Sequence, residues 1–281
     1  MARLSKAQAK AHAEAEAILS KDRLSEDEKF FILENWQESA HHVNNLAGAF
    51  FTPWPLARDL SIEVNRGRVI DLCAGIGVLS FFCERNADEI VCVEKNPDYV
   101  RVGRKMLPDA RWIEGDIFDL PRDLGAFDFA ISNPPFGAIK RAKATSPRYR
   151  GADFEYHVID IASDLADYGV FIIPQMSAPF RYSGEPCYSR SESQKYQSFA
   201  TATSIALEPS CGIDTSVYRN DWRGVAPAVE VVTTDFIEAR SRRLAGETPT
   251  LFADLPTDER SHRRQLRDRR AEVERAARER L

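Results

Sequence analysis

The sequence predicts an α/β protein built on a doubly wound, mostly parallel β-sheet. Short apolar runs alternate with stretches of helical periodicity, which is the order of strand–helix–strand units. The first run ends in the turn Gly75-x-Gly77, where a strand would pass directly into a helix. A later run, 127–132, is stopped by Pro134 and Pro135, because proline has no N–H to donate to a central strand.

Two helices are predicted ahead of the sheet, in an N-terminal helical extension over residues 1–45. Residues 4–20 are rich in Ala, Glu and Lys, which favour a helix but offer little apolar surface. Ser25 and Glu28 form a capping box for a second helix, expected from about residue 26 to 39. These helices are candidates for a protein contact or for dimerisation.

The sheet is expected to follow a short helix that runs through Leu60. Five successive strands are expected within 68–85, 89–107, 110–118, 127–137 and 169–174. Apolar spacing predicts a helix over 153–169, after the fourth strand. The segment 175–203 is expected to be irregular. Strands near 204–207 and 228–236 would then complete a seven-stranded sheet, with an antiparallel hairpin at its end.

Composition and charge exclude several classes of protein. A net charge of −5 and a pI near 5.7 do not describe a protein that coats nucleic acid nonspecifically. No apolar run approaches the roughly 20 residues of a membrane span, and the first residues lack a signal-peptide core, so we expect a cytoplasmic protein. The cysteines form no CxxC pair and the histidines show no ligand spacing, so we expect no metal site.

Three basic and aromatic segments are candidate contacts for a nucleic acid. They are the loop after Phe136, the segment 180–199, and the residues around Tyr218 to Arg223. From residue 241 to 281, Arg and Glu mix at helical spacing, which is typical of a solvated helix and predicts a charged C-terminal helical tail.

Residues suited to a nucleotide-like cofactor recur where the predicted strands end. Gly75 and Gly77 permit close approach to the backbone, while Ser80 stands where a dinucleotide-binding fingerprint has its third glycine. Glu94 ends the second strand and is placed to accept hydrogen bonds from ribose hydroxyls. Asp116 ends the third strand. A methyl donor without a pyrophosphate suits this pattern better than a dinucleotide.

The segment Asn133-Pro134-Pro135-Phe136 follows the fourth strand as a rigid, extended loop at its carboxyl end. In an open parallel sheet this is where ligands bind, so Asn133 and Phe136 would be presented to a ligand. Ahead of the sheet, Thr52 is predicted to cap a helix that Pro53 begins.

The ordered series FTP, DLCAGIG and NPPF resembles the gamma-type N6-adenine DNA methyltransferases, a family of class I S-adenosylmethionine-dependent enzymes. The resemblance covers about residues 46–240 and implies a Rossmann-like seven-stranded methyltransferase sheet. It implies S-adenosyl-L-methionine as the cofactor, bound by Phe51, Thr52, Pro53, Asp71, Cys73, Ala74, Gly75, Gly77, Glu94, Lys95, Asp116, Ile117 and Asn133. Asp71 would serve the methionine ammonium and Asp116 the cofactor's adenine. The implied catalytic residues are Asn133, Pro134, Pro135 and Phe136. The Asn133 amide oxygen and the Pro134 carbonyl would accept both N–H bonds of a planar amino group, and Phe136 would stack on its ring.

The resemblance implies direct in-line transfer of a methyl group to N6 of an adenine flipped out of a nucleic acid, with DNA favoured. Transfer to cytosine C5 needs a Pro-Cys nucleophile after the fourth strand, whereas Cys187 lies well beyond the fifth, which argues against that chemistry. Three alternatives stay open. They are the same transfer to RNA, transfer to a protein glutamine amide, and a non-catalytic module that binds a partner through its terminal helices.

Overall fold

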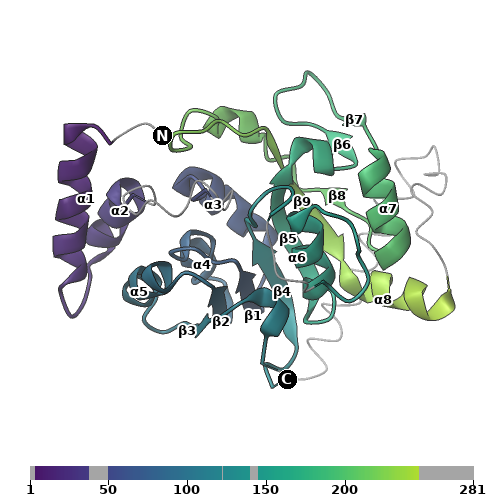
Figure 1. The fold of residues 1–281 in the computed structure, drawn as a ribbon, viewed down its shortest axis with the longest axis horizontal. Helices are drawn as coiled ribbons and strands as arrows, with labels where there is room; N and C mark the ends of the chain where they lie inside the picture. Colours follow the sequence, from purple (N-terminus) through teal and green to yellow (C-terminus); the bar gives the residue numbers. More distant parts are fainter. Residues whose placement is uncertain (1–3, 38–49, 122, 140–144, 247–281) are drawn as a thin grey trace, which may run out of the picture. The chain divides into compact units, whose positions relative to one another are not determined.

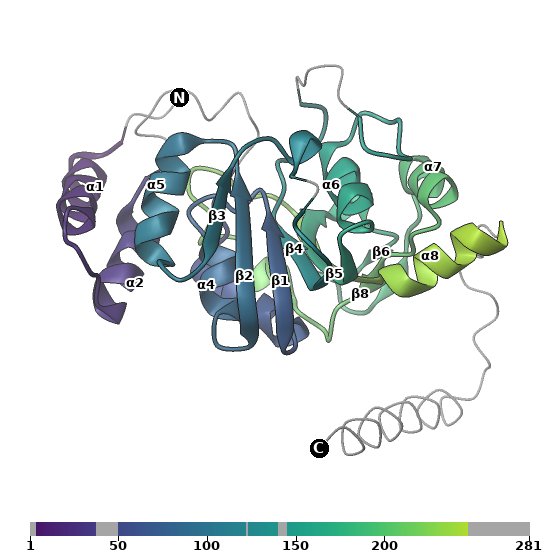
Figure 2. The same ribbon diagram turned by 90° about the horizontal axis from the view of Figure 1, so that it is seen from below.

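The computed structural model describes residues 4–37, 50–121, 123–139 and 145–246. Its main feature is a seven-stranded sheet of order β3-β2-β1-β4-β5-β9-β8 (Figures 1 and 2). The strands are β1 (Gly67–Leu72), β2 (Ala87–Glu94), β3 (Arg111–Glu114), β4 (Phe127–Ser132), β5 (Ala166–Pro174), β8 (Glu208–Pro209) and β9 (Val229–Asp235). Strands β1 to β5 pair in parallel, and β9 runs antiparallel to β5 and to β8. The predicted seven-stranded, mostly parallel sheet is confirmed.

The helices cover both faces of this sheet. They are α1 (Lys6–Leu19), α2 (Glu26–Asn35), α3 (Trp54–Leu60), α4 (Val78–Cys83), α5 (Pro97–Met106), α6 (Phe154–Ala162), α7 (Gln194–Thr203) and α8 (Phe236–Ala245). From β1 the sheet continues through β2 to β3 on one side, and from β4 it continues to β5 on the other. Right-handed crossovers therefore put α4 and α5 on one face and α6 on the other (Figure 2).

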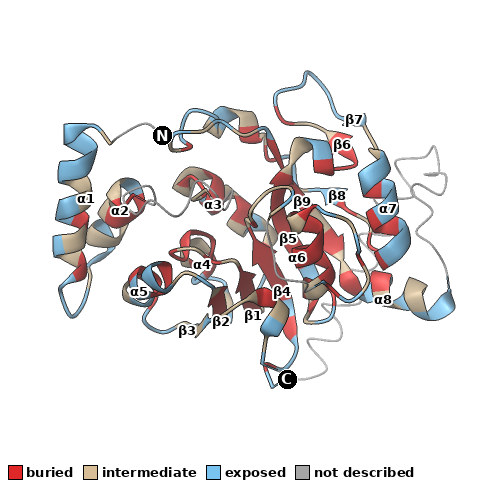
Figure 3. Ribbon diagram, in the orientation of Figure 1, coloured by how far each residue is buried: buried red, intermediate tan, exposed pale blue. Residues whose placement is uncertain are grey.

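The core lies between the central strands and these helices. Strands β1 and β4 read as nearly continuous apolar runs because both of their faces are covered. Figure 3 shows buried residues along the strands and on the inward sides of the helices. The N-terminal helices contribute to the same core, since Ile32, Leu33 and Trp36 are buried in one cluster with Val69. Among the described residues, no helix combines the length and the apolar character needed to cross a membrane.

Several predicted boundaries were wrong, because tertiary contacts override local patterns. Helix α2 ends at Asn35 rather than 39, since Trp36 is extended with ψ 126°. Helix α6 ends at Ala162, and Leu165 lies in the turn before β5 instead of in a helix to 169. The cap of α3 is Pro53 without a side-chain bond, so Thr52 does not cap this helix.

The segment after β5 is more regular than predicted. It holds a hairpin of β6 (Phe180–Arg181) and β7 (Ser189–Arg190), followed by α7. Ser204 takes a left-handed conformation, φ 58°, at the end of α7, so no strand spans 204–207 and the edge strand is β8 instead. Of the predicted C-terminal tail, the structure describes only residues 241–246, and the rest lies outside the described residues.

Candidate active site

The candidate site lies where the strand order reverses, at the carboxyl ends of β1 and β4. These strands pair directly, with Asp71 opposite Ile131. The loops that follow them begin at Cys73 and Asn133 and therefore start side by side. In open parallel sheets, this switch point is where ligands bind.

The turn after β1 winds through three left-handed residues. Cys73, Gly75 and Gly77 have φ values of 65°, 59° and 86°. The amide of Ala74 donates to the Val93 carbonyl at 2.9 Å, which ties the turn to β2. A side chain at position 75 would come within 3.3 Å of the Phe51 ring. Glycine at this position therefore lets the Phe51 ring pack closely on the turn.

Glu94 links this turn to the next helix. Its carboxylate accepts a hydrogen bond from the Gly75 amide at 2.8 Å and another from the Asn96 amide at 2.7 Å. Burial raises the pKa of Glu94, although these backbone donors oppose the shift. Each carboxylate oxygen keeps a further acceptor position. Glu94 can therefore still receive ribose hydroxyls, which remains its predicted role.

Asp116 lies at the end of β3, as predicted, and caps a short 3-10 helix, η4 (Ile117–Asp119). One of its oxygens accepts from the Phe118 amide at 3.2 Å, and the other pairs with the Lys95 ammonium at 2.8 Å. Ile117 is buried. The pair joins the ends of β2 and β3 on the rim of the site.

Asp71 is 1 % exposed and faces α4. Its Oδ2 accepts from the Ser80 hydroxyl at 2.7 Å, while its Oδ1 has no partner among the described residues. Burial raises the pKa of Asp71 to about 7; the Ser80 hydrogen bond opposes this, and the Glu94 charge adds to it. The direct contact of Asp71 is thus with Ser80, and its role toward the methionine ammonium stays a prediction.

Asn133 is held by the segment that contains Thr52. Its Nδ2 donates to the Phe50 carbonyl at 3.0 Å and to the Thr52 hydroxyl at 2.9 Å. A main-chain carbonyl can only accept, so the amide nitrogen must face it and the orientation of the side chain is fixed. The Oδ1 of Asn133 is buried and has no partner among the described residues. The site thus presents an amide oxygen that is free to accept a hydrogen bond.

Two further elements hold the end of the NPPF loop. Gly137 donates its amide to Glu155 Oε2 at 2.9 Å and accepts from the Phe154 amide at 2.9 Å. Glu155, 1 % exposed, also accepts from the Ser177 hydroxyl at 2.7 Å. The sequence did not predict the role of Glu155 or the Thr52–Asn133 hydrogen bond. Each joins segments that are distant in the chain, and no motif or periodicity in the sequence indicates such a contact.

The other predicted site residues line the same switch point. Phe51 packs over Gly75, and Pro53 precedes α3 and accepts from the Ala57 amide at 3.0 Å. Pro134 is buried, whereas Pro135 and Phe136 are half-buried. Phe136 packs against the core cluster.

The three segments predicted to contact a nucleic acid differ in how far their side chains are exposed. Tyr196 is buried and its hydroxyl accepts from the Leu207 amide at 3.0 Å, so its ring offers no stacking surface. Trp222 is also buried. Tyr188 and Arg190 of the β6–β7 hairpin and Arg219 are exposed. The loop after Phe136 lies partly outside the described residues, at 140–144.

The residues of the switch point fit a methyl-donor cofactor. The left-handed turn keeps Cys73 and Gly75 partly exposed, and Glu94 ends the adjacent strand with acceptor capacity to spare. The described residues bring together no group of three His, Cys, Asp or Glu side chains that could hold a metal ion.

Part of the chain is similar to a known protein family. Residues 55–147 match the family model of the methyltransferase small domain. This segment runs from α3 through the loop after β4 and so includes the turn at Gly75, Glu94, Asp116 and Asn133. The match supports a methyltransferase with S-adenosyl-L-methionine as its cofactor.

Solved structures resemble the chain at low sequence identity. A putative RNA methyltransferase from Pyrococcus horikoshii is 18% identical, with a TM-score of 0.50 over 75% of this chain and 98% of its own. The 23S rRNA methyltransferase ErmE is 13% identical, with a TM-score of 0.44 over 66% of this chain and 68% of its own. The 16S rRNA N2 G1207 methyltransferase RsmC of T. thermophilus, solved with AdoMet and guanosine, is 19% identical with a TM-score of 0.42, over 67% of this chain and 44% of its own.

At such identities only the fold can be compared, and the first of these likenesses supports it. The chain has the Rossmann-like fold of a methyltransferase, as the sequence predicted. A search of curated proteins gave no match.

Proposed function

We propose that this methyltransferase acts on the exocyclic N6 amino group of adenine, with DNA as the favoured substrate. The observation that carries the proposal is the Oδ1 of Asn133, a buried amide oxygen without a partner among the described residues. A buried acceptor of this kind costs free energy unless a ligand supplies a donor. An N–H of the target amino group is a suitable donor.

The chemistry explains why such an acceptor is needed. The lone pair of an adenine amine is delocalised into the ring, so the nitrogen is a weak nucleophile. Asn133 and the Pro134 carbonyl would each accept one N–H bond, which favours a more tetrahedral nitrogen as the transition state forms. The cofactor would supply an electrophilic methyl group on a sulfonium, with the S–C bond breaking to leave S-adenosylhomocysteine as the N–C bond forms. The methylated nitrogen then releases one proton to solvent. The chain supplies orientation and hydrogen bonds, and no covalent enzyme intermediate is required.

Phe136 is proposed to stack on the target base. It is half-buried and follows Asn133 by three residues, so its ring and the acceptor belong to one short loop. Base–aromatic stacking is worth roughly 1–3 kcal/mol. In a duplex, the target adenine must leave the helix to reach this loop. The only cysteine preceded by proline, Cys187, is exposed in the β6–β7 hairpin, which argues against cytosine C5 chemistry.

The substrate class is tested by labelled methyl transfer. The protein is incubated with labelled S-adenosylmethionine and, separately, with adenine-containing DNA, RNA and a protein extract. We expect label in DNA. Asn133→Ala should lower the rate by roughly 10²- to 10³-fold, which is the typical cost of losing one transition-state hydrogen bond. Asn65→Ala, an exposed asparagine outside the site, is the matched control and should retain the wild-type rate.

The outcomes separate the alternatives. Label in RNA or in protein, but not in DNA, would contradict the proposed DNA substrate and leave the proposed role of Asn133 unchanged. Equal labelling by the wild type and Asn133→Ala would refute the proposed role of Asn133. No transfer to any of the three classes would favour a non-catalytic module.

A further inference from the structure

An aromatic cluster connects the N-terminal helices to the turn after β1. The fully buried Trp36 lies 5.8 Å from the Phe51 ring and 5.8 Å from the Tyr99 ring, measured between centroids. Phe51 and Tyr99 pack edge to face at 4.9 Å. Phe51 in turn comes within 3.3 Å of the place where a Cβ on Gly75 would lie. Trp36 therefore supports the ring that covers the glycine turn.

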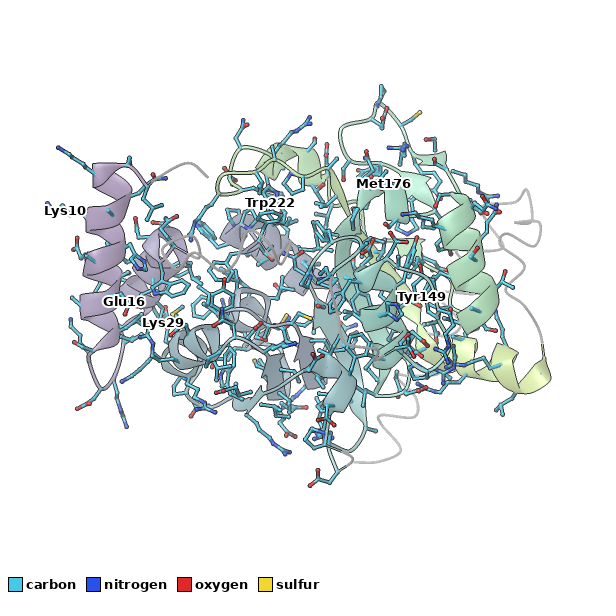
Figure 4. The ribbon with its side chains drawn as sticks, viewed as in Figure 1. Lys10, Glu16, Lys29, Tyr149, Met176 and Trp222 are labelled. Carbon is cyan, nitrogen blue, oxygen red and sulfur yellow. The ribbon has the colours of Figure 1, made fainter. Side chains whose placement is uncertain are left out.

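Trp36 is fixed in place by polar contacts from α1 and α5. Its indole N–H donates to Glu16 Oε1 of α1 at 2.7 Å. Arg101 of α5 donates to both oxygens of the same carboxylate, at 2.8 and 3.2 Å. Figure 4 shows Glu16 and Lys10 on different sides of α1, with Lys10 pointing outward. Burial would raise the pKa of Glu16, but the bonds from Arg101 and Trp36 outweigh it and lower that pKa.

A third contact fixes the end of α2. The Arg223 guanidinium donates to the carbonyl of Leu33, in the last turn of α2, and to the carbonyl of Trp36, just beyond its end. The adjacent amide of Gln37 donates to His12 Nδ1 at 3.0 Å. Trp36 is thus held by α1, by α5 and by the segment before β9.

These contacts form a continuous series of interactions from Gly75 through α5 and back to Phe51. Gly75 donates to Glu94, Glu94 also accepts from Asn96 at the start of α5, and α5 carries Tyr99, which packs on Phe51. We propose that Trp36 is a positioning residue for the S-adenosylmethionine site, acting through Phe51 to set the shape of the turn at Gly75. The inference rests on the cofactor assignment and is independent of the substrate proposed above. It makes the N-terminal helix pair a part of the cofactor site.

An aromatic residue of α2 provides a control. Phe30 packs edge to face on Trp54 and Phe81, each at 5.6 Å, and lies 6.1 Å from Phe82. Its ring contacts α3 and α4, and among the described residues it makes no ring contact with Phe51. Replacing Phe30 therefore removes aromatic packing of α2 without disturbing the ring over Gly75.

The test measures cofactor affinity by titration calorimetry, with no substrate present. S-adenosylmethionine and S-adenosylhomocysteine are titrated into the wild type, Trp36→Leu, Trp36→Phe and Phe30→Leu. Because two aromatic contacts are lost, Trp36→Leu should weaken both ligands on the order of tenfold. Trp36→Phe keeps a ring beside Phe51 and should weaken them less. Phe30→Leu should bind as the wild type does, even where its melting temperature falls.

Transfer kinetics provide a second readout. Trp36→Leu should raise the KM for S-adenosylmethionine and leave kcat at saturating cofactor within about twofold of the wild type, because Trp36 touches neither reacting group. Wild-type affinity in both Trp36 variants, or an equal loss in Phe30→Leu, would overturn the inference. If Trp36→Leu does not fold, Trp36→Phe decides between these outcomes. A wild-type protein that binds neither ligand would refute the cofactor assignment itself.

Discussion

At the scale of single residues, Asp71 is a carboxyl whose charged form is disfavoured by burial. Its carboxyl is 1 % exposed, and one of its oxygens has no partner among the described residues. Burial raises its pKa from 3.8 to about 7. The folded chain therefore binds this proton more tightly than the unfolded chain. Stability from this group is fully present below pH 3.8 and is lost as the pH rises toward 7.

Asp71→Asn should remove this pH dependence. The amide oxygen can still accept from Ser80, and the side chain no longer ionises. Wild-type stability should fall between pH 5 and pH 8 by about 3 kcal/mol at most relative to the variant, because about two pKa units of the shift lie in this window, at 1.36 kcal/mol per unit. Urea unfolding at the two pH values measures the difference, with the exposed Asp98→Asn as control. Parallel pH profiles of the wild type and Asp71→Asn would contradict the raised pKa.

Some features of the candidate site could be predicted from the sequence, and others could not. Glu94, Asp116 and Asn133 could be predicted because each follows a strand, and parallel strands bring their carboxyl ends to one edge. The bond between Asn133 and Thr52 could not be predicted, since it joins residues 81 positions apart. Neither local propensity nor periodicity carries information about such a contact.

At the scale of elements, the NPPF loop depends on α6 and on the turn after β5. Glu155 is the first-turn acid of α6 and bridges Gly137 to Ser177. Its two bonds define where the loop leaves the site, because the amide of Gly137 directly follows Phe136. We therefore expect Glu155 to position the loop without touching the substrate.

Glu155→Ala should lower kcat about tenfold or more while the KM for S-adenosylmethionine stays near the wild-type value. It would leave the partly buried Gly137 N–H without its side-chain acceptor, and a loosened loop would lose alignment with the amino group. Glu155→Gln retains one acceptor oxygen, and the Ser177 hydroxyl can rotate to accept from its nitrogen, so activity should be partly restored. Steady-state kinetics with the exposed Glu238→Gln as control test this. A change confined to KM would contradict the positioning role.

Elements were predicted well where local signals and burial agree. The capping boxes at Ser5 and Ser25 start α1 and α2, and the latter was predicted correctly. The end of α2 was missed because Trp36 leaves the helix to fill the core, where Arg223 then caps the helix. Helix α7 was missed because its sequence, QKYQSFATAT, is polar and weakly periodic, and its buried face is set by contacts with α6, such as the 4.4 Å stack of Phe199 on Tyr156.

At the scale of the whole molecule, the N-terminal helices share the core of the sheet domain. Ile32, Leu33 and Trp36 are at most 4 % exposed and belong to one cluster with residues of β1 and α4. Burying three such side chains contributes on the order of 5 kcal/mol. That is comparable with the total stability of many domains. The described part of the predicted extension, residues 4–37, is therefore proposed to be an integral part of the fold.

Deletion of residues 1–37 should consequently destabilise the entire chain. We expect the truncated protein to melt at least about 10 °C below the full chain or to be recovered unfolded, because the surfaces of α3, α4 and α5 lose their cover. Calorimetry or circular dichroism measures this, and Lys10→Ala on the exposed side of α1 should leave the melting temperature unchanged. An unaltered melting temperature in the truncated protein would show that the helices are a separable arm.

The central claim is that Asn133 directs a methyl group to the amino nitrogen of a nucleic-acid base. Its most direct test is nucleoside analysis by mass spectrometry, after DNA has been incubated with S-adenosylmethionine and either the wild type or Asn133→Ala. The account predicts N6-methyl-2′-deoxyadenosine with the wild type and a loss of two to three orders of magnitude with the variant. A methyl group found on a ring carbon, such as C5 of cytosine, or equal yields from the two proteins, would contradict it.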